Sequence, residues 1–166
     1  MPRRLLRDRQ IVVDEWRYVA EAPADTAVAL IVTFDQWQAE PDTWAKRGSR
    51  LGVVLSPAHK VEQLAPDLAR FALIGAEFSG PSEGRGYTQA RLLRERWNFK
   101  GELRALGFVR RDQLFFMARC GFNSFELPES DLEDAAKAFS TFSAAYQPSN
   151  DIGLAFKLRP GIPASA

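Results

Sequence analysis

The side chains best suited to chemistry lie in one arginine-rich stretch in the middle of the chain. Residues 83–113 hold eight basic and four acidic side chains among thirty-one residues. The whole chain of 166 residues has 22 Lys and Arg against 21 Asp and Glu, a net charge of only +1. No overall field therefore attracts nucleic acid or an acidic membrane, and any preference for an anion must be local to this stretch.

Glycines and arginines at the beginning of this stretch favour an anion site. Gly84, Arg85 and Gly86 come just before a helix that we expect from Thr88 to Trp97. Free backbone N–H groups and the positive end of the helix dipole would favour an anion there. Arg91 near the helix start opposes the dipole, and a bound anion would offset that repulsion. The alternative is a structural network in which the arginines pair with acidic neighbours.

A second candidate site follows the next expected strand, Gly101–Gly107. Glu102 and Arg104 are two residues apart, so they point to the same face of the strand. Because an isolated buried charge is costly, they should be paired or lie at a cleft. Arg111 and Asp112 begin the following helix, so we expect a polar cluster at the end of the sheet. A network that only holds the crossover loops in place is the alternative.

No metal centre or cofactor fingerprint is evident in the sequence. The one cysteine, Cys120, and the one histidine, His59, are too few to ligate an iron–sulfur cluster or a structural zinc. Gly84, Gly86 and Ala90 imitate a dinucleotide fingerprint, but no acidic residue ends the following strand. We therefore expect no cofactor and no metal, with Cys120 as a buried structural thiol and His59 as a loop residue.

From Leu51 onward, turn residues separate the apolar segments at regular intervals, and this pattern predicts the strands and helices that position these residues. Short apolar runs that stop at turn residues predict strands, and apolar stripes at helical spacing predict helices. The expected strands are Leu51–Leu55, Phe71–Phe78, Gly101–Gly107 and Ser124–Leu127. The expected helices are Thr88–Trp97, Arg110–Cys120 and, after a capping box at Ser130–Glu133, a stripe that continues to Tyr146. This alternation favours parallel strands with right-handed crossovers.

The amino-terminal third is less regular. Strands are expected at Gln10–Val19 and Ala27–Phe34, followed by a helix that Thr33 or Asp35 caps and Pro41 breaks. A full (β/α) barrel takes about 250 residues, more than this chain has. We therefore predict an α/β fold with a partial (β/α) barrel-like parallel sheet and extra N-terminal strands.

We predict a single domain over residues 1–166. It comprises an irregular α/β entry (1–50), a βα core (51–147) and a tail (148–166) in which Ile152–Leu158 adds an edge strand.

The central stretch also resembles a known family. The runs GRGYTQARLLRER, GELRALG and RRDQLFFMARCGF, with SFEL after them, resemble a bacterial domain-of-unknown-function family labelled "oxidoreductase probably involved in sulfite reduction". Genes of that family typically lie beside assimilatory sulfite reductase and the adenylylsulfate reductases. The resemblance implies a place in that pathway, with sulfite reductase or adenylylsulfate reductase as the candidate partner. Its signature falls on Gly84, Arg85, Gly86, Tyr87, Ala90, Arg91, Leu93, Arg94, Glu95, Arg96, Gly101, Glu102, Arg104, Arg111, Asp112, Gln113, Arg119, Cys120, Gly121 and Phe122.

Two functions of different classes fit these observations. The first is an accessory protein of assimilatory sulfate and sulfite reduction that binds a small oxyanion or a reductase partner. Its anion-binding residues would be Arg85, Gly86, Arg91, Arg104 and Arg111. The alternative is a lyase- or isomerase-like enzyme on a barrel-derived sheet, with Glu102 or Asp112 as the proton carrier.

Localisation and assembly follow from the apolar pattern. Nothing approaches the apolar length of a signal-peptide core or of a membrane span of roughly eighteen residues, so we expect a cytoplasmic protein. A half-barrel sheet has open edges that invite pairing, and Phe115 and Phe116 cannot both face one side of a helix. We therefore predict a two-fold symmetric homodimer.

Overall fold

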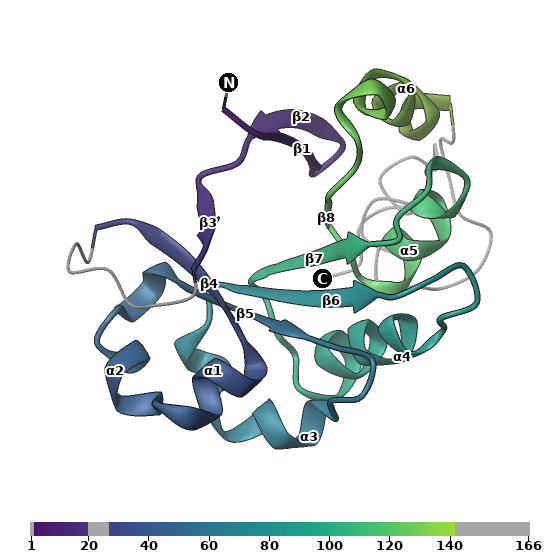
Figure 1. Ribbon diagram of the computed structural model, residues 1–166. Helices are drawn as coiled ribbons and strands as arrows, with labels where there is room; N and C mark the ends of the chain where they lie inside the picture. Colours follow the sequence, from purple (N-terminus) through teal and green to yellow (C-terminus); the bar gives the residue numbers. More distant parts are fainter. Residues whose placement is uncertain (1, 20–26, 142–166) are drawn as a thin grey trace, which may run out of the picture.

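A curled sheet of eight strands forms the centre of residues 2–19 and 27–141, the part of the chain that the computed structural model describes (Figure 1). The strands are Arg4–Arg7 (β1), Gln10–Val13 (β2), Trp16–Tyr18 (β3), Ala29–Thr33 (β4), Leu51–Leu55 (β5), Leu73–Phe78 (β6), Glu102–Gly107 (β7) and Ser124–Phe125 (β8). Their order is β2-β1-β8-β7-β6-β5-β4-β3. Neighbours from β3 to β8 run parallel, whereas β1 is antiparallel to β8 and to β2. The predicted α/β fold with a partial-barrel sheet and extra N-terminal strands is confirmed.

Short helices connect the strands. The α-helices are Phe34–Ala39 (α1), Pro41–Ala45 (α2), Val61–Leu64 (α3), Arg85–Arg91 (α4), Leu114–Cys120 (α5) and Leu132–Thr141 (α6). Shorter 3-10 turns lie at Gly48–Arg50, Ala65–Arg70, Arg111–Gln113 and Glu129–Asp131, and α4 continues as a π-helix over Leu92–Arg96. Helices α1 to α5 lie along the outside of the curled sheet, and α6 packs beside β1 and β2 (Figure 1). None of the helices described is long and apolar enough to cross a membrane.

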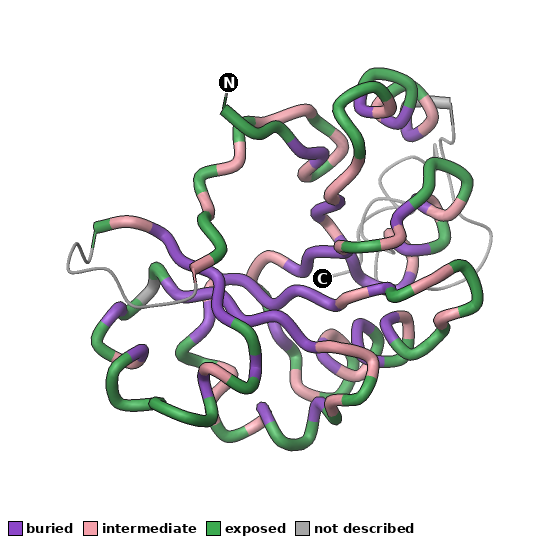
Figure 2. The backbone as a smooth tube through the Cα atoms, viewed as in Figure 1, coloured by how far each residue is buried: buried purple, intermediate pink, exposed green. Residues whose placement is uncertain are grey.

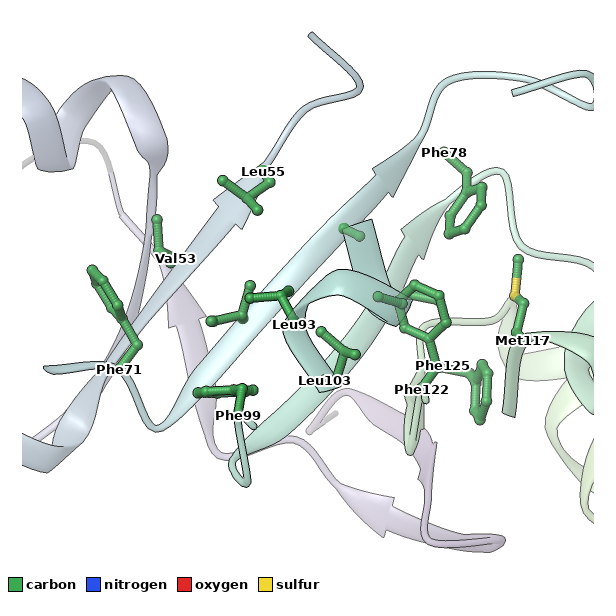
Figure 3. Close-up of a cluster of buried hydrophobic side chains, with 14 of the residues drawn as sticks. Val53, Leu55, Phe71, Phe78, Leu93, Phe99, Leu103, Met117, Phe122 and Phe125 are labelled. Atoms are coloured by element: carbon green, nitrogen blue, oxygen red, sulfur yellow. The ribbon is translucent and has the colours of Figure 1, made fainter. Parts of the chain in front are cut away.

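The main hydrophobic core lies between these helices and the outer face of the sheet. Figure 2 shows the central strands β4 to β7 mostly buried, whereas β2, β3 and the outer sides of the helices are more exposed. Alternation along each strand decides which side chains enter the core, so Leu103 and Ala105 of β7 face the helices. Phe78, Phe122 and Phe125 pack in the same cluster (Figure 3). Glu102 and Arg104, in the intervening positions of β7, therefore face the concave side of the sheet.

The segment Gln10–Val19, expected as one strand, is divided in two. The Asp14 carboxylate accepts a hydrogen bond from the backbone N–H of Trp16 at 3.1 Å, and this local bond interrupts the strand after Val13. The two halves occupy opposite edges of the sheet, β2 at one and β3 at the other. The chain therefore joins both edges of the curled sheet through only Asp14 and Glu15.

Helix α4 begins three residues earlier than predicted. The helix was expected to begin at Thr88, but it begins at Arg85. The Glu83 carboxylate accepts the backbone N–H of Arg85 at 2.9 Å and so satisfies the first turn. The strand expected at Ser124–Leu127 is shorter, only Ser124–Phe125.

Several expectations are confirmed in detail. Thr33 caps α1 through reciprocal hydrogen bonds with Gln36, and Pro41 begins α2. Gly121 ends α5 with a φ of 121°, a left-handed conformation that favours glycine. The helix end at Tyr146, the core boundary at residue 147 and the tail with its edge strand Ile152–Leu158 lie outside the described residues.

Candidate functional site

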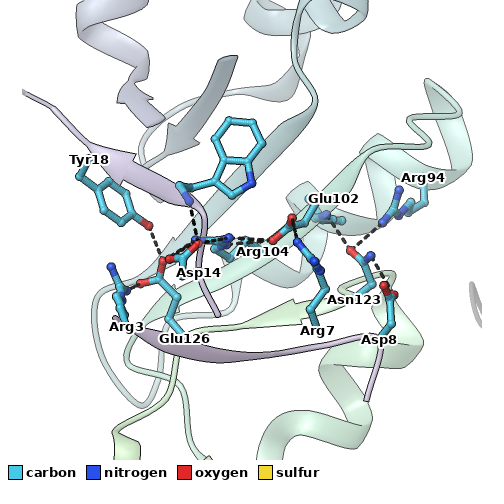
Figure 4. Close-up of polar contacts among 12 residues, drawn as sticks. Arg3, Arg7, Asp8, Asp14, Tyr18, Arg94, Glu102, Arg104, Asn123 and Glu126 are labelled. Atoms are coloured by element: carbon cyan, nitrogen blue, oxygen red, sulfur yellow. Dashed lines mark hydrogen bonds and ion pairs between the residues drawn. The ribbon is translucent and has the colours of Figure 1, made fainter. Parts of the chain in front are cut away.

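Arg104 lies fully buried on the concave face of the sheet and is surrounded by carboxylates (Figure 4). Its guanidinium forms a bidentate pair with Asp14, with both N–O distances 3.0 Å. It also donates to Oε1 of Glu102 at 2.9 Å and to Oε1 of Glu126 at 3.2 Å. Burial alone would lower the pKa of Arg104, but the Glu102 and Asp14 carboxylates raise it above its ordinary value.

An outer ring of side chains balances this cluster. Arg7 pairs with Glu102 at 3.4 Å, and Arg3 pairs with Glu126. The Tyr18 hydroxyl donates to Glu126 at 2.5 Å, and burial followed by the nearby Glu126 charge raises the pKa of Tyr18. Three arginines thus face three carboxylates, and the network ties β1, β2 and β3 to the middle of the sheet. We call Arg3, Arg7, Asp14, Tyr18, Glu102, Arg104 and Glu126 the Arg104 network.

This network was only half visible in the sequence. Glu102 and Arg104 meet on one face, as their spacing predicts. Arg104 is not available to a dissolved anion, however, because its side chain is fully buried and already paired with three carboxylates. Asp14 and Glu126 were missed, since Asp14 lies ninety residues from Arg104 in a segment without a motif, and Glu126 was noted only as part of the SFEL run.

The predicted cluster of Glu102, Arg104, Arg111 and Asp112 does not form. Glu102 begins β7 and Asp112 follows its end, so the six-residue strand, roughly 16 Å long, separates them. Arg111 instead pairs with Asp134 of α6 at 3.7 Å, and Asp112 with Arg110 at 3.5 Å. These side chains and Asp131 border a depression lined by two arginines and three aspartates, which therefore does not favour an anion.

The start of α4 does not provide the expected anion site either. The Glu83 carboxylate already accepts the Arg85 N–H that an anion would use. Gly86 is buried against the Phe78 ring, and a Cβ there would lie 2.6 Å from the ring. Gly86 therefore permits close packing of helix on strand. The Arg85 side chain is exposed and forms no ion pair with the described residues.

An aromatic pair with nearby arginines occupies the outer surface between α4 and α5. The rings of Tyr87 and Phe116 lie 5.0 Å apart, and Phe116 is 50% exposed. Arg91, on the same side of α4 as Tyr87, is half exposed and reaches Glu95 only at 3.9 Å. We call Arg85, Tyr87, Arg91 and Phe116 the α4–α5 face. Beneath it Cys120 is buried as predicted, and burial raises the pKa of its thiol despite Arg91 nearby.

Ser56, His59 and Asp35 meet at the carboxyl ends of β4 and β5, in an order that resembles a nucleophile, a base and an acid. Ser56 Oγ lies 3.1 Å from His59 Nδ1, and His59 Nε2 lies 3.3 Å from Asp35. The backbone N–H of Ser56 donates to the same Nδ1 at 3.0 Å, and the N–H of His59 donates back to Ser56 at 3.1 Å. The single lone pair of Nδ1 is thus taken by the backbone, so His59 stabilises this loop rather than activating Ser56.

Comparison with known proteins bears on the strands and helices that follow β4. Residues 52–155 match the family described as "Bacterial protein of unknown function (DUF934)". The chain belongs to this family. The matched span contains the α4–α5 face and Arg104, whereas Asp14 and Tyr18 precede it. No curated protein and no solved structure gives a significant match.

Proposed function

We propose that this DUF934 protein is an accessory protein of assimilatory sulfate and sulfite reduction that docks on an anionic surface of a reductase. The α4–α5 face is the docking surface. The pathway is what the resemblance of the central stretch implies, with sulfite reductase or adenylylsulfate reductase as the partner. One observation carries the docking: the half-exposed Phe116 ring, in tilted contact with the Tyr87 ring and accompanied by Arg85 and Arg91.

The composition of this face supports a protein partner. Tyr and Arg are the residue types that most often dominate binding energy at interfaces, and an exposed aromatic ring offers an apolar centre. Arg91 pairs with a carboxylate only through an exposed contact of 3.9 Å to Glu95, which contributes little in water, and it also hydrogen-bonds the buried Cys120 thiol. Arg85 forms no ion pair within the described residues. Neither guanidinium group has a strong carboxylate partner among the described residues, so both are open to carboxylates of a partner.

A free small oxyanion is the less favoured ligand of this region. Such an ion needs several convergent donors. Glu83 already occupies the α4 N–H group, and Arg111 is paired with Asp134. The arginines of the α4–α5 face are spread along a helix rather than gathered around one point. A broad anionic protein surface fits this arrangement better.

The test is capture of purified sulfite reductase and adenylylsulfate reductase on the immobilised full chain. We expect Phe116→Ser and Arg91→Glu each to weaken binding at least about tenfold, as expected of interface hot spots. Arg70→Glu, an exposed arginine of the 3-10 turn before β6, is the matched control and should bind like the wild type. Equal weakening by Arg70→Glu, or no capture of either reductase, would refute the proposal.

Calorimetry with sulfite, sulfate and adenylylsulfate completes the test. If the face binds a protein, we expect Phe116→Ser not to reduce the affinity for these ions. Tight binding that Arg91→Glu abolishes and Phe116→Ser leaves intact would instead favour the small oxyanion.

A further inference from the structure

A depression of about 420 Å³ opens at the amino ends of β7 and β8, at the opposite end of these strands from the start of α5. Four core phenylalanines, each at most 7% exposed, form its apolar floor: Phe99, Phe122, Phe125 and Phe139. Figure 3 shows Phe122 and Phe125 together, with Phe99 on the other side of Leu103. The size lies within the usual range of small-molecule sites. We call this depression the phenylalanine bowl.

Three cations stand around the bowl: Arg9, Arg94 and Lys100. Among the described residues, none of the three has a carboxylate within ion-pair distance, in contrast to the paired arginines of the Arg104 network. The one acid in the lining, Asp8, accepts a hydrogen bond from the Asn123 side chain at 3.1 Å. Three positive charges against one negative charge leave the bowl electropositive.

Arg94 is the most deeply placed of the three cations. It donates to the backbone carbonyls of Phe99 at 2.7 Å, Gly101 at 2.9 Å and Gly121 at 3.0 Å (Figure 4 shows its side chain). Burial lowers the pKa of Arg94, although the Asp8 charge acts in the opposite direction. The carbonyls satisfy its N–H groups but carry no net charge. Its partly desolvated charge therefore favours an anion in the bowl.

Arg9 is held in place by the turn between β1 and β2. Asp8 and Arg9 have φ angles of 50° and 67°, the left-handed conformation that two-residue hairpin turns require. The Arg9 guanidinium lies over the Phe139 ring at 5.5 Å from its centre. The turn thus fixes a cation directly beside the apolar surface.

We propose that the phenylalanine bowl binds a small aromatic anion. The flat ring of the ligand packs on the phenylalanines, and its phosphate or sulfate group lies among Arg9, Arg94 and Lys100. Arginine and lysine bind tetrahedral oxyanions through charge-assisted hydrogen bonds, and the apolar surface adds contact that a bare ion cannot make. This site shares no residue with the α4–α5 face and is independent of the reductase proposal.

The test is calorimetric titration of the full chain with phenyl phosphate and, separately, with inorganic phosphate. We expect phenyl phosphate to bind at least about tenfold more tightly than inorganic phosphate, because only the ester contacts the phenylalanines. Equal affinity for the two compounds, or no binding of phenyl phosphate at millimolar concentration, would overturn the proposal.

Variants at the rim locate the site. Lys100→Gln and Arg9→Gln should each weaken the binding of phenyl phosphate at least about threefold. The double variant should weaken it about tenfold or more. Arg96→Gln is the matched control, since Arg96 is exposed nearby but outside the bowl and contacts Glu62 and Trp97. Arg94 is left intact because it also holds three carbonyls. If Arg96→Gln weakens binding as much as the rim variants, the bowl is not the site.

The same variants separate this proposal from the reductase proposal. Phe116→Ser should leave phenyl phosphate binding unchanged, and Lys100→Gln should leave capture of a reductase unchanged. Loss of phenyl phosphate binding in Phe116→Ser would count against a separate site in the bowl.

Discussion

At the scale of single residues, Arg104 illustrates how a full charge is kept out of water. Its side chain is fully buried, yet each charged group around it has a partner of opposite sign. Such a pair costs desolvation energy when it forms, and it becomes strongly destabilising only when one partner is removed. The Arg104 network therefore acts mainly as a device that specifies where the amino-terminal strands attach.

Replacement of Arg104 tests this role. Arg104→Met leaves the carboxylates of Asp14, Glu102 and Glu126 without their central cation, so we expect a loss of about 3–5 kcal/mol in the free energy of unfolding. The measurement is urea denaturation at neutral pH. Arg7→Met, which removes a more exposed partner of Glu102 at 3.4 Å, is the control and should cost less than about 1 kcal/mol. If Arg104→Met also lost less than about 1 kcal/mol, the structural role of Arg104 would be contradicted.

Tyr18 adds a pH dependence to the same network. Burial and the Glu126 charge raise the pKa of Tyr18 in the folded protein, whereas an unfolded tyrosine ionises near pH 10. The folded state thus binds the proton more tightly, and its stabilising contribution, complete below about pH 10, is lost as the pH rises further. Urea midpoints from pH 8 to pH 11 should fall less steeply in Tyr18→Phe than in the wild type. Parallel curves would show that the Tyr18 hydroxyl does not contribute.

At the scale of elements, the packing of α4 on β6 depends on a glycine. Gly86 lies directly against the Phe78 ring of β6, and α4 could not approach the strand so closely with a side chain at this position. The α4–α5 face is carried by the same helix. The placement of Tyr87 and Arg91 over α5 therefore depends on this contact.

Gly86→Ala measures how tight the contact is. Its Cβ would lie 2.6 Å from Cζ of Phe78, a distance that forces helix and strand apart, and we expect a loss of about 1–3 kcal/mol in stability. Gly84→Ala is a close control, because nothing lies within 4 Å of a Cβ at that position. The two variants are compared by thermal denaturation. A destabilised Gly84→Ala beside an unchanged Gly86→Ala would contradict the packing argument.

At the scale of the whole molecule, the edges of the sheet decide how it can assemble. Within the described residues β2 pairs only with β1, and β3 only with β4. Asp14 and Glu15 join these two edge strands. The homodimer was predicted from open sheet edges, and both of these edges lie next to this short connection. The homodimer stays a prediction.

Light scattering at micromolar concentration tests this prediction. A dimer has twice the chain mass of 18.6 kDa. Backbone pairing at an exposed strand edge is the expected contact, so Val13→Pro in β2, where the backbone N–H faces away from β1, should shift the mass toward 18.6 kDa if β2 mediates it. A wild-type mass of 18.6 kDa would show that the chain satisfies its own edges.

Local chemistry made the central elements predictable. Leu51–Leu55 is a short apolar run between turn residues, and Gly101–Gly107 alternates charged with apolar side chains; both patterns are typical of strands. The cap at Thr33 and the helix end at Gly121 depend on neighbours within a few residues. The amino-acid sequence alone therefore predicts these features. It also predicts that Arg104 and Leu103 point to opposite faces of the strand.

Contacts between distant segments could not be derived in this way. The partners of Arg104 come from positions ninety and twenty-two residues away, Asp14 and Glu126, and the curvature of the sheet brings them together. The same strand length holds Glu102 and Asp112 apart, although both lie in one arginine-rich stretch. Residue types and short-range spacing are properties of the sequence, whereas the pairing of charges depends on sheet order and strand length. Tertiary structure therefore determined which arginines are buried in ion pairs and which remain on the surface.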